Sequence, residues 1–292
     1  MSGATPPDAA SPNAPRVRFT ATQAQRLREL GAGAGVSESD FAGADARNAA
    51  FRELEERLTR EGRERLLDLR ASGRAPLLPA LEADLAAAVR GAGFVQVVTP
   101  HVITADALAR MGVEHGHPLR DQVFWLQDGR CLRPMLAPNL YTLLRRLGRI
   151  YTRPFGIFEI GTCFRRDSKG ASHLNEFTMM NLVELGRGGA EGRARLRELA
   201  ALVMHAAGIA DYELVATESD VYGDMLDVEV RGSEVCSACV GPLPMDGNWG
   251  IVEPWVGLGF GLERLLMARE GYAGIERVGR SLRYLDAVRL NI

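Results

Sequence analysis

The stretch from Gly156 to Leu185 constrains the fold more than any other part of the chain. It contains two apolar segments joined by a polar loop, which predicts two antiparallel strands. Because side chains alternate between the faces of a strand, Arg165 of the first strand and Phe177 and Asn181 of the second point into one space. The alternative is an amphipathic hairpin whose arginines are merely solvated. A single amide among apolar neighbours, however, needs a hydrogen-bond partner.

Composition predicts a globular protein with a substantial core. The 292 residues are 46% hydrophobic and carry a formal net charge of -2, which allows one large domain or two small ones. The overall charge indicates no nucleic-acid partner, although unevenly placed arginines leave room for a local basic patch. Four cysteines and no signal segment indicate a reducing, cytoplasmic location. No apolar run approaches the roughly 18 to 20 residues that cross a bilayer, so we expect no membrane partner.

Three regions follow one another along the chain. Residues 1–15 contain almost no large apolar side chain, which predicts a disordered tail over residues 1–18. Residues 19–75 form a helical region, in which we expect a short helix capped by Thr20 and ended at Gly31, and a densely charged helix from about Asp45 to Ala71. The charged face of this helix is either an ordinary solvated surface or a surface that binds the phosphate backbone of a nucleic acid. The arginines in question are Arg47, Arg52, Arg57, Arg60, Arg63, Arg65 and Arg70.

The main domain, residues 76–292, mixes helices with hairpins and predicts an α+β fold with a largely antiparallel sheet. A strand over 94–99 ends at Pro100, which cannot donate to a ladder and therefore favours a sheet edge. Asp128-Gly129 predicts a tight hairpin. The other expected elements are helices over 77–90, 137–146, 194–207 and 262–269 and strands over 212–216, 226–230 and 234–240.

Glycines at 257, 259 and 261 lead into a helix that carries Arg264. The run lacks the last glycine and the βαβ context of a dinucleotide fingerprint. Without Cβ atoms, however, the backbone allows a flat ligand to lie close. Because Arg264 follows this glycine run, it is a candidate phosphate ligand. An isolated arginine, by contrast, is more often a solvated surface residue.

Cys236 and Cys239 invite a zinc interpretation, but residues three apart on a strand point to opposite faces. We therefore expect small apolar filler there. Glu234 and Ser237 are also three positions apart, so on a regular strand their side chains point to opposite faces. Both can contact one metal ion only if a bulge or a turn interrupts the strand.

These segments resemble the class II aminoacyl-tRNA synthetases. FEIGTCFRRD followed by HLNEFTMMNL is similar to the second signature of that class, GLGFGLERLL to the third, and the helix, strand and Pro100 to the first. LRPMLAPNLY, VYGDMLDV, CSACVGP and SLRYLDAV are similar to the catalytic domain of the pyrrolysyl branch. The resemblance covers roughly residues 20–292 and implies an antiparallel sheet flanked by helices.

The resemblance implies a ligase that activates an amino acid with ATP and transfers it to tRNA. It assigns Arg165 and Arg264 catalytic roles and Glu234 and Ser237 a magnesium site. The implied ATP-binding residues are Arg165, Asp167, His173, Phe177, Glu234, Ser237, Gly259 and Arg264.

The implied amino-acid pocket begins with one face of the helix over 137–146, a face that plain core packing would also explain. Its residues are Ala137, Leu140, Tyr141, Leu144, Asn181, Val183, Tyr222, Cys239, Trp255 and Gly257. A roomy pocket with one amide suits pyrrolysine, whose side-chain carbonyl Asn181 could recognise.

Two positions depart from the family pattern. Asp167 replaces the usual glutamate and Leu258 the usual alanine, and we expect Leu258 to add bulk to the pocket floor. The alternatives are a paralogue with changed amino-acid specificity, a non-catalytic tRNA-binding protein, or a ligase that acts without tRNA. The resemblance further implies a homodimer. We expect no separate N-terminal tRNA-binding domain, so the helices before Pro76 or a partner protein would hold the tRNA.

Overall fold

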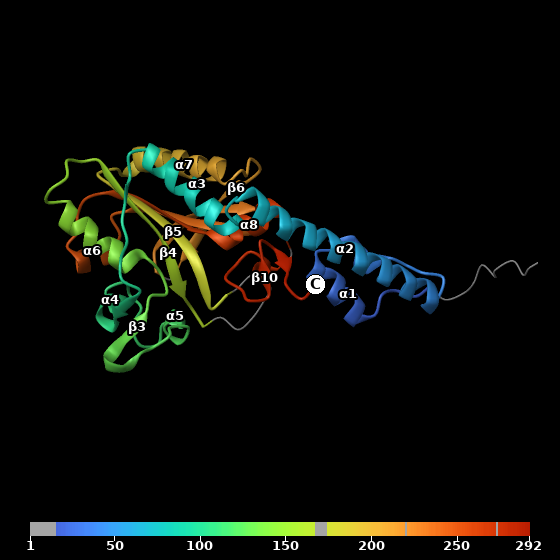
Figure 1. Cartoon of the computed structure of the whole chain (residues 1–292). Coiled ribbons are helices and arrows are strands. Elements are labelled where there is room, and N and C mark those ends of the chain that lie inside the picture. Colours follow the sequence, from blue (N-terminus) through green and yellow to red (C-terminus); the bar gives the residue numbers. More distant parts are fainter. Residues whose placement is uncertain (1–15, 167–173, 220, 273) are drawn as a thin grey trace, which may run out of the picture. The chain divides into compact units, whose positions relative to one another are not determined.

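A computed structural model describes residues 16–166, 174–219, 221–272 and 274–292 (Figure 1). The chain divides into two compact units, one of which is Ala75–Leu282. The other joins the residues up to Arg74 with the C-terminal Arg283–Ile292. Among the helices of the described part of the chain, none is long and apolar enough to cross a membrane.

The unit that contains residues 16–74 and Arg283–Ile292 consists of two α-helices, one 3-10 helix and a C-terminal hairpin. Thr20 caps α1 and forms a capping box with Gln23, and left-handed Gly31 ends this helix as expected. Arg65 and Arg74 of the first segment both bind Asp286, through its backbone oxygen and its carboxylate respectively. The elements are α1 (Ala21–Leu30), η1 (Ala34–Glu38), α2 (Ala44–Ser72), β10 (Tyr284–Leu285) and β11 (Val288–Arg289).

The unit Ala75–Leu282 is built on a seven-stranded sheet. Only the pairing of β1 with β4 is parallel; the other neighbouring strands are antiparallel. The short β1 lies at a sheet edge before Pro100, which confirms the prediction from that proline. In spatial order the strands are β1 (Val95–Gln96), β4 (Phe155–Phe164), β5 (Glu176–Leu185), β9 (Trp255–Gly261), β8 (Ser233–Gly241), β7 (Gly223–Val230) and β6 (Glu213–Ser219).

Three helices, α3 (Leu77–Gly91), α7 (Gly189–Ala206) and α8 (Leu262–Glu270), pack together on one face of the sheet (Figure 1). The opposite face carries α6 (Ala137–Leu147) and most of the short elements. These are β2 (Val102–Thr104), α4 (Ala105–Ala109), α5 (Pro118–Asp121), η2 (Gln127–Gly129), β3 (Arg130–Leu132) and η3 (Pro244–Trp249), whereas η4 (Ile275–Arg277) contacts α8. The expected α+β class is confirmed.

The hairpin predicted between Gly156 and Leu185 is β4 and β5. Cys163 pairs with Phe177 and Glu159 with Asn181, so the residues expected to share a face do so. Asp128 adopts a left-handed conformation at the expected turn, and the flanking segments bridge there.

Candidate active site

A buried ion pair between Arg133 and Glu159 lies on the same face of the β4–β5 hairpin as Asn181, the residue paired with Glu159. The two side chains are 1% exposed and their charged atoms are 2.8 Å apart. Thr99 completes the group, because its backbone N–H and its hydroxyl donate to the two Glu159 oxygens. Gly161 leaves room for it, since a Cβ there would lie 2.3 Å from an Arg133 nitrogen. The hairpin is thereby tied to the segment before Pro100.

Two arginines, Arg165 just after β4 and Arg264 in α8, lie close to each other. Arg165 Nε donates to the Pro134 carbonyl at 2.9 Å, and its guanidinium carbon lies 5.4 Å from the centre of the Phe177 ring. Burial and the positive charge of nearby Arg264 both lower the pKa of Arg165. Arg264 is in the first turn of α8, where the helix dipole also favours anions. An anion between the two guanidinium groups would relieve their repulsion.

Oxygen donors lie beside this cationic end. The pairing of β7 with β8 shifts register next to Glu234, and this bulge brings the Glu234 carboxylate and the Ser237 hydroxyl to 3.2 Å. Arg264 Nη1 lies 3.2 Å from Glu234 Oε2. One oxygen of Asp227 is buried without a hydrogen-bond partner in the described structure. The sequence predicted that Glu234 and Ser237 could share a metal ion only if a bulge or a turn interrupted the strand, and the structure contains that bulge.

These donors fit a magnesium ion. Carboxylate and hydroxyl oxygens are hard ligands, and Mg²⁺ is typically held by one or two carboxylates together with phosphates and water. Within the described residues, no three His, Cys, Asp or Glu side chains form a metal-binding cluster. An ion held by Glu234 and Ser237 would therefore depend on ligand phosphates and water for its remaining coordination.

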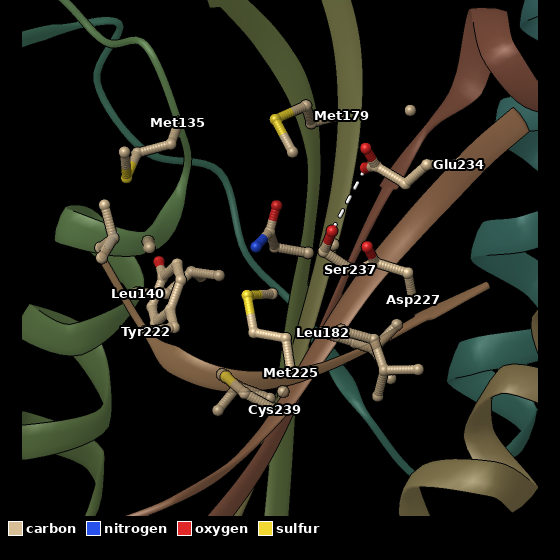
Figure 2. A pocket seen from close by; sticks show the side chains of 18 of the residues that line it. Met135, Leu140, Met179, Leu182, Tyr222, Met225, Asp227, Glu234, Ser237 and Cys239 are labelled. Carbon is tan, nitrogen blue, oxygen red and sulfur yellow. Dashed lines mark hydrogen bonds between the residues drawn. The ribbon is translucent and has the colours of Figure 1, made fainter. Parts of the chain in front are cut away.

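One cavity of about 690 Å³ joins the cationic end to an apolar end. Figure 2 shows Asp227, Glu234 and Ser237 together on one side, with Met135 and Leu140 across the cavity. All ten residues of the expected amino-acid pocket line it, as do six of the eight expected ATP-binding residues. The other two, Asp167 and His173, lie outside the described residues.

Asn181 lies between the two ends. Its side-chain oxygen is buried and has no hydrogen-bond partner in the described structure. A Cβ at Gly259 would come within 3.2 Å of the Asn181 amide, and one at Gly257 within 2.7 Å of the Trp255 ring. The glycines of β9 therefore make room for these two side chains, and the unpartnered Asn181 oxygen is available as a hydrogen-bond acceptor for a ligand.

Known proteins match both the fold and most of the sequence. The family model for the class II core domain of tRNA synthetases (F) matches residues 70–206. A crystal structure of pyrrolysyl-tRNA synthetase from Desulfitobacterium hafniense is 52% identical, with 94% of this chain and 99% of that chain covered and a TM-score of 0.90. A second structure of a pyrrolysyl-tRNA synthetase from that organism is also 52% identical, covering 94% and 98%, with a TM-score of 0.89. The chain belongs to the pyrrolysyl-tRNA synthetase family.

The expectation that Leu258 adds bulk to the pocket floor is wrong. Leu258 alternates with Gly257 and Gly259 on β9 and is 1% exposed. Val256, on the same face as Leu258, lies against Gly192 of α7. The Leu258 side chain therefore points to the helical face of the sheet, while Gly257 and Gly259 on either side of it face the cavity.

Several residues that line the cavity were not predicted from the sequence. Met179 has the same parity as Phe177 and Asn181, so alternation alone could have found it. Met135, Met225 and Asp227 come from segments whose approach depends on the fold. Glu263 was also missed: burial raises its pKa to about 7, although the Thr178 backbone N–H donates to both of its oxygens.

Proposed function

We propose that this chain joins pyrrolysine, or a lysine derivative of similar length, to its cognate tRNA through an aminoacyl-adenylate. The observation that carries the proposal is one cavity in which Arg165 and Arg264 lie at one end, apolar side chains line the other, and Asn181, with an unpartnered side-chain oxygen, lies between them. The first end suits a triphosphate and the second a long side chain with one polar group.

The adenylate forms when the substrate carboxylate attacks the α-phosphate of ATP and pyrophosphate leaves. The carboxylate is already a nucleophile, so the protein must align it and stabilise charge on the phosphorus oxygens. Arg165, fixed by its bond to the Pro134 carbonyl, supplies that positive charge, and Arg264 holds the outgoing phosphates. Phe177 offers its ring to adenine beside Gly259. Mg²⁺ bound by Glu234 and Ser237 would neutralise phosphate charge.

Amino-acid-dependent exchange of pyrophosphate into ATP tests the proposal. We expect exchange with long-chain lysine derivatives that carry a side-chain carbonyl, and much less with analogues in which a methylene replaces it. Asn181→Ala should lower kcat/KM for the carbonyl substrates by roughly 100-fold and remove the discrimination, because the side-chain N–H of Asn181 no longer donates to the carbonyl. The methylene analogues are the matched control. No exchange with any of these compounds would refute the function, and exchange only with other amino acids would indicate changed specificity.

We also propose that α2 contacts the tRNA. Arg52, Arg60 and Arg63 are exposed on this helix and fit a phosphate backbone. The double variant Arg60→Glu and Arg63→Glu should raise KM for tRNA in aminoacylation at least ~10-fold and leave pyrophosphate exchange unchanged. The matched control reverses exposed Arg193 and Arg197 on α7. An equal effect of both variants would contradict this role.

A homodimer through the edge at β1 is our third proposal. Val95, Val98 and Val102 are 44%, 89% and 40% exposed, which leaves an apolar strip along this segment. Light scattering at micromolar concentration should give twice the 31.8 kDa chain mass. Val98→Asp should shift the mass towards one chain, because a charge buried in an interface is costly. A wild-type mass of one chain would contradict the dimer.

A further inference from the structure

Asp246 lies behind the apolar end of the cavity and holds two of its aromatic walls. Its side chain is 1% exposed. The Tyr141 hydroxyl donates to Oδ1 at 2.7 Å, while the Trp255 indole N–H donates to Oδ2, also at 2.7 Å. The backbone N–H of Leu243 donates to Oδ2 as well. One buried carboxyl group thus joins α6, β9 and the start of η3.

The orientation of these two rings determines the shape of the apolar end. The Tyr141 ring stacks on Trp249 at 5.4 Å between centroids and meets Trp255 edge-on at 5.8 Å. Tyr141 and Trp255 line the cavity, whereas Asp246 does not. Burial raises the pKa of Tyr141, which keeps its hydroxyl available as a donor. Asp246 can therefore act on a bound molecule only through the rings that it holds.

We propose that Asp246 is a positioning residue that sets which amino-acid side chains the pocket accepts, by fixing the Tyr141 and Trp255 rings. This inference rests on the proposed function, in which the apolar end receives the amino-acid side chain. Loss of both acceptor oxygens would leave a buried hydroxyl and a buried indole N–H without partners. The rings would then turn towards other acceptors or admit water, and the pocket would lose its defined length.

Pyrophosphate exchange with a long-chain lysine derivative and a shorter one separates this role from general destabilisation. Asp246→Ala should raise KM for the long derivative at least ~10-fold and lower the preference for it, while KM for ATP stays within about twofold. Asp246→Asn should retain most of the preference, because its carbonyl can accept from Trp255 while its amide donates to the Tyr141 oxygen. Leu199→Ala, a buried change on α7, is the control for lost stability.

A second readout does not depend on activity. Exchange of the Trp255 indole hydrogen with solvent, followed by NMR and assigned with Trp255→Phe, should be slow in the wild type and in Asp246→Asn and fast in Asp246→Ala. If the wild type lacks exchange activity, the proposed function fails while this signal still tests whether Asp246 fixes the ring. Should Asp246→Ala not fold, Tyr141→Phe removes one of the same bonds and should weaken the preference at least threefold.

Three results would overturn the proposal. The first is a change of KM for amino acid and for ATP by the same factor in Asp246→Ala. The second is a loss of preference in Leu199→Ala as large as that in Asp246→Ala. The third is an indole hydrogen of Trp255 that stays protected when the carboxyl group is absent.

Discussion

Arg165→Ala should lower kcat for amino-acid-dependent pyrophosphate exchange at least ~1,000-fold, because a fixed positive charge at the reacting phosphate is lost. The guanidinium is held by the Pro134 carbonyl and by the Phe177 ring, so it is ordered before any ligand arrives. Arg165→Lys keeps the charge but not the fork geometry and should recover only part of the rate.

Exposed Arg197 on α7 provides the control, and Arg197→Ala should leave exchange unchanged. The melting temperature of Arg165→Ala should stay close to that of the wild type, since removing Arg165 relieves its repulsion with Arg264. Retention of more than a tenth of the wild-type kcat by Arg165→Ala would contradict the assigned role.

Glu159→Ala should lower the free energy of unfolding by about 3 to 5 kcal/mol, because it leaves the Arg133 charge buried without its partner. Both side chains are 1% exposed, so solvent cannot replace the lost carboxylate. Chemical denaturation measured by circular dichroism checks the change. Glu198→Ala removes an exposed partner of Arg195 and should cost less than about 1 kcal/mol.

The double variant Arg133→Met and Glu159→Leu sharpens this prediction. Replacing a buried pair by apolar residues is often neutral or stabilising, so the double variant should be more stable than Glu159→Ala alone. Equal losses in Glu159→Ala and Glu198→Ala would show that the buried pair contributes no more than an exposed one.

Local patterns in the sequence predicted much of the structure because they depend on neighbouring residues. The capped helix from Thr20 to Gly31, the edge strand before Pro100 and the β4–β5 hairpin all follow from short-range rules. Alternation correctly placed Arg165, Phe177 and Asn181 on one side of that hairpin. The same rule, applied to β9, would have turned Leu258 away from the cavity.

Short-range rules could not predict the register between neighbouring strands or the contacts between segments that are distant in the sequence. The bulge that brings Glu234 to Ser237 depends on how β8 meets β7, and no pattern within β8 reveals it. Likewise, no local pattern indicated that the C-terminal residues Arg283–Ile292 belong with α2. These features arise only when separate segments of the chain pack against each other.

By itself the sequence determined the element types, the family signatures and the face on which the hairpin's functional side chains lie. It could do so because strand alternation and helix capping act over a few residues. Only the tertiary structure decided that Arg133 meets Glu159 and that Asp246 holds both Tyr141 and Trp255. Asp246 and Tyr141 are 105 positions apart, and a hydrogen bond across that separation depends on the packing of the whole unit.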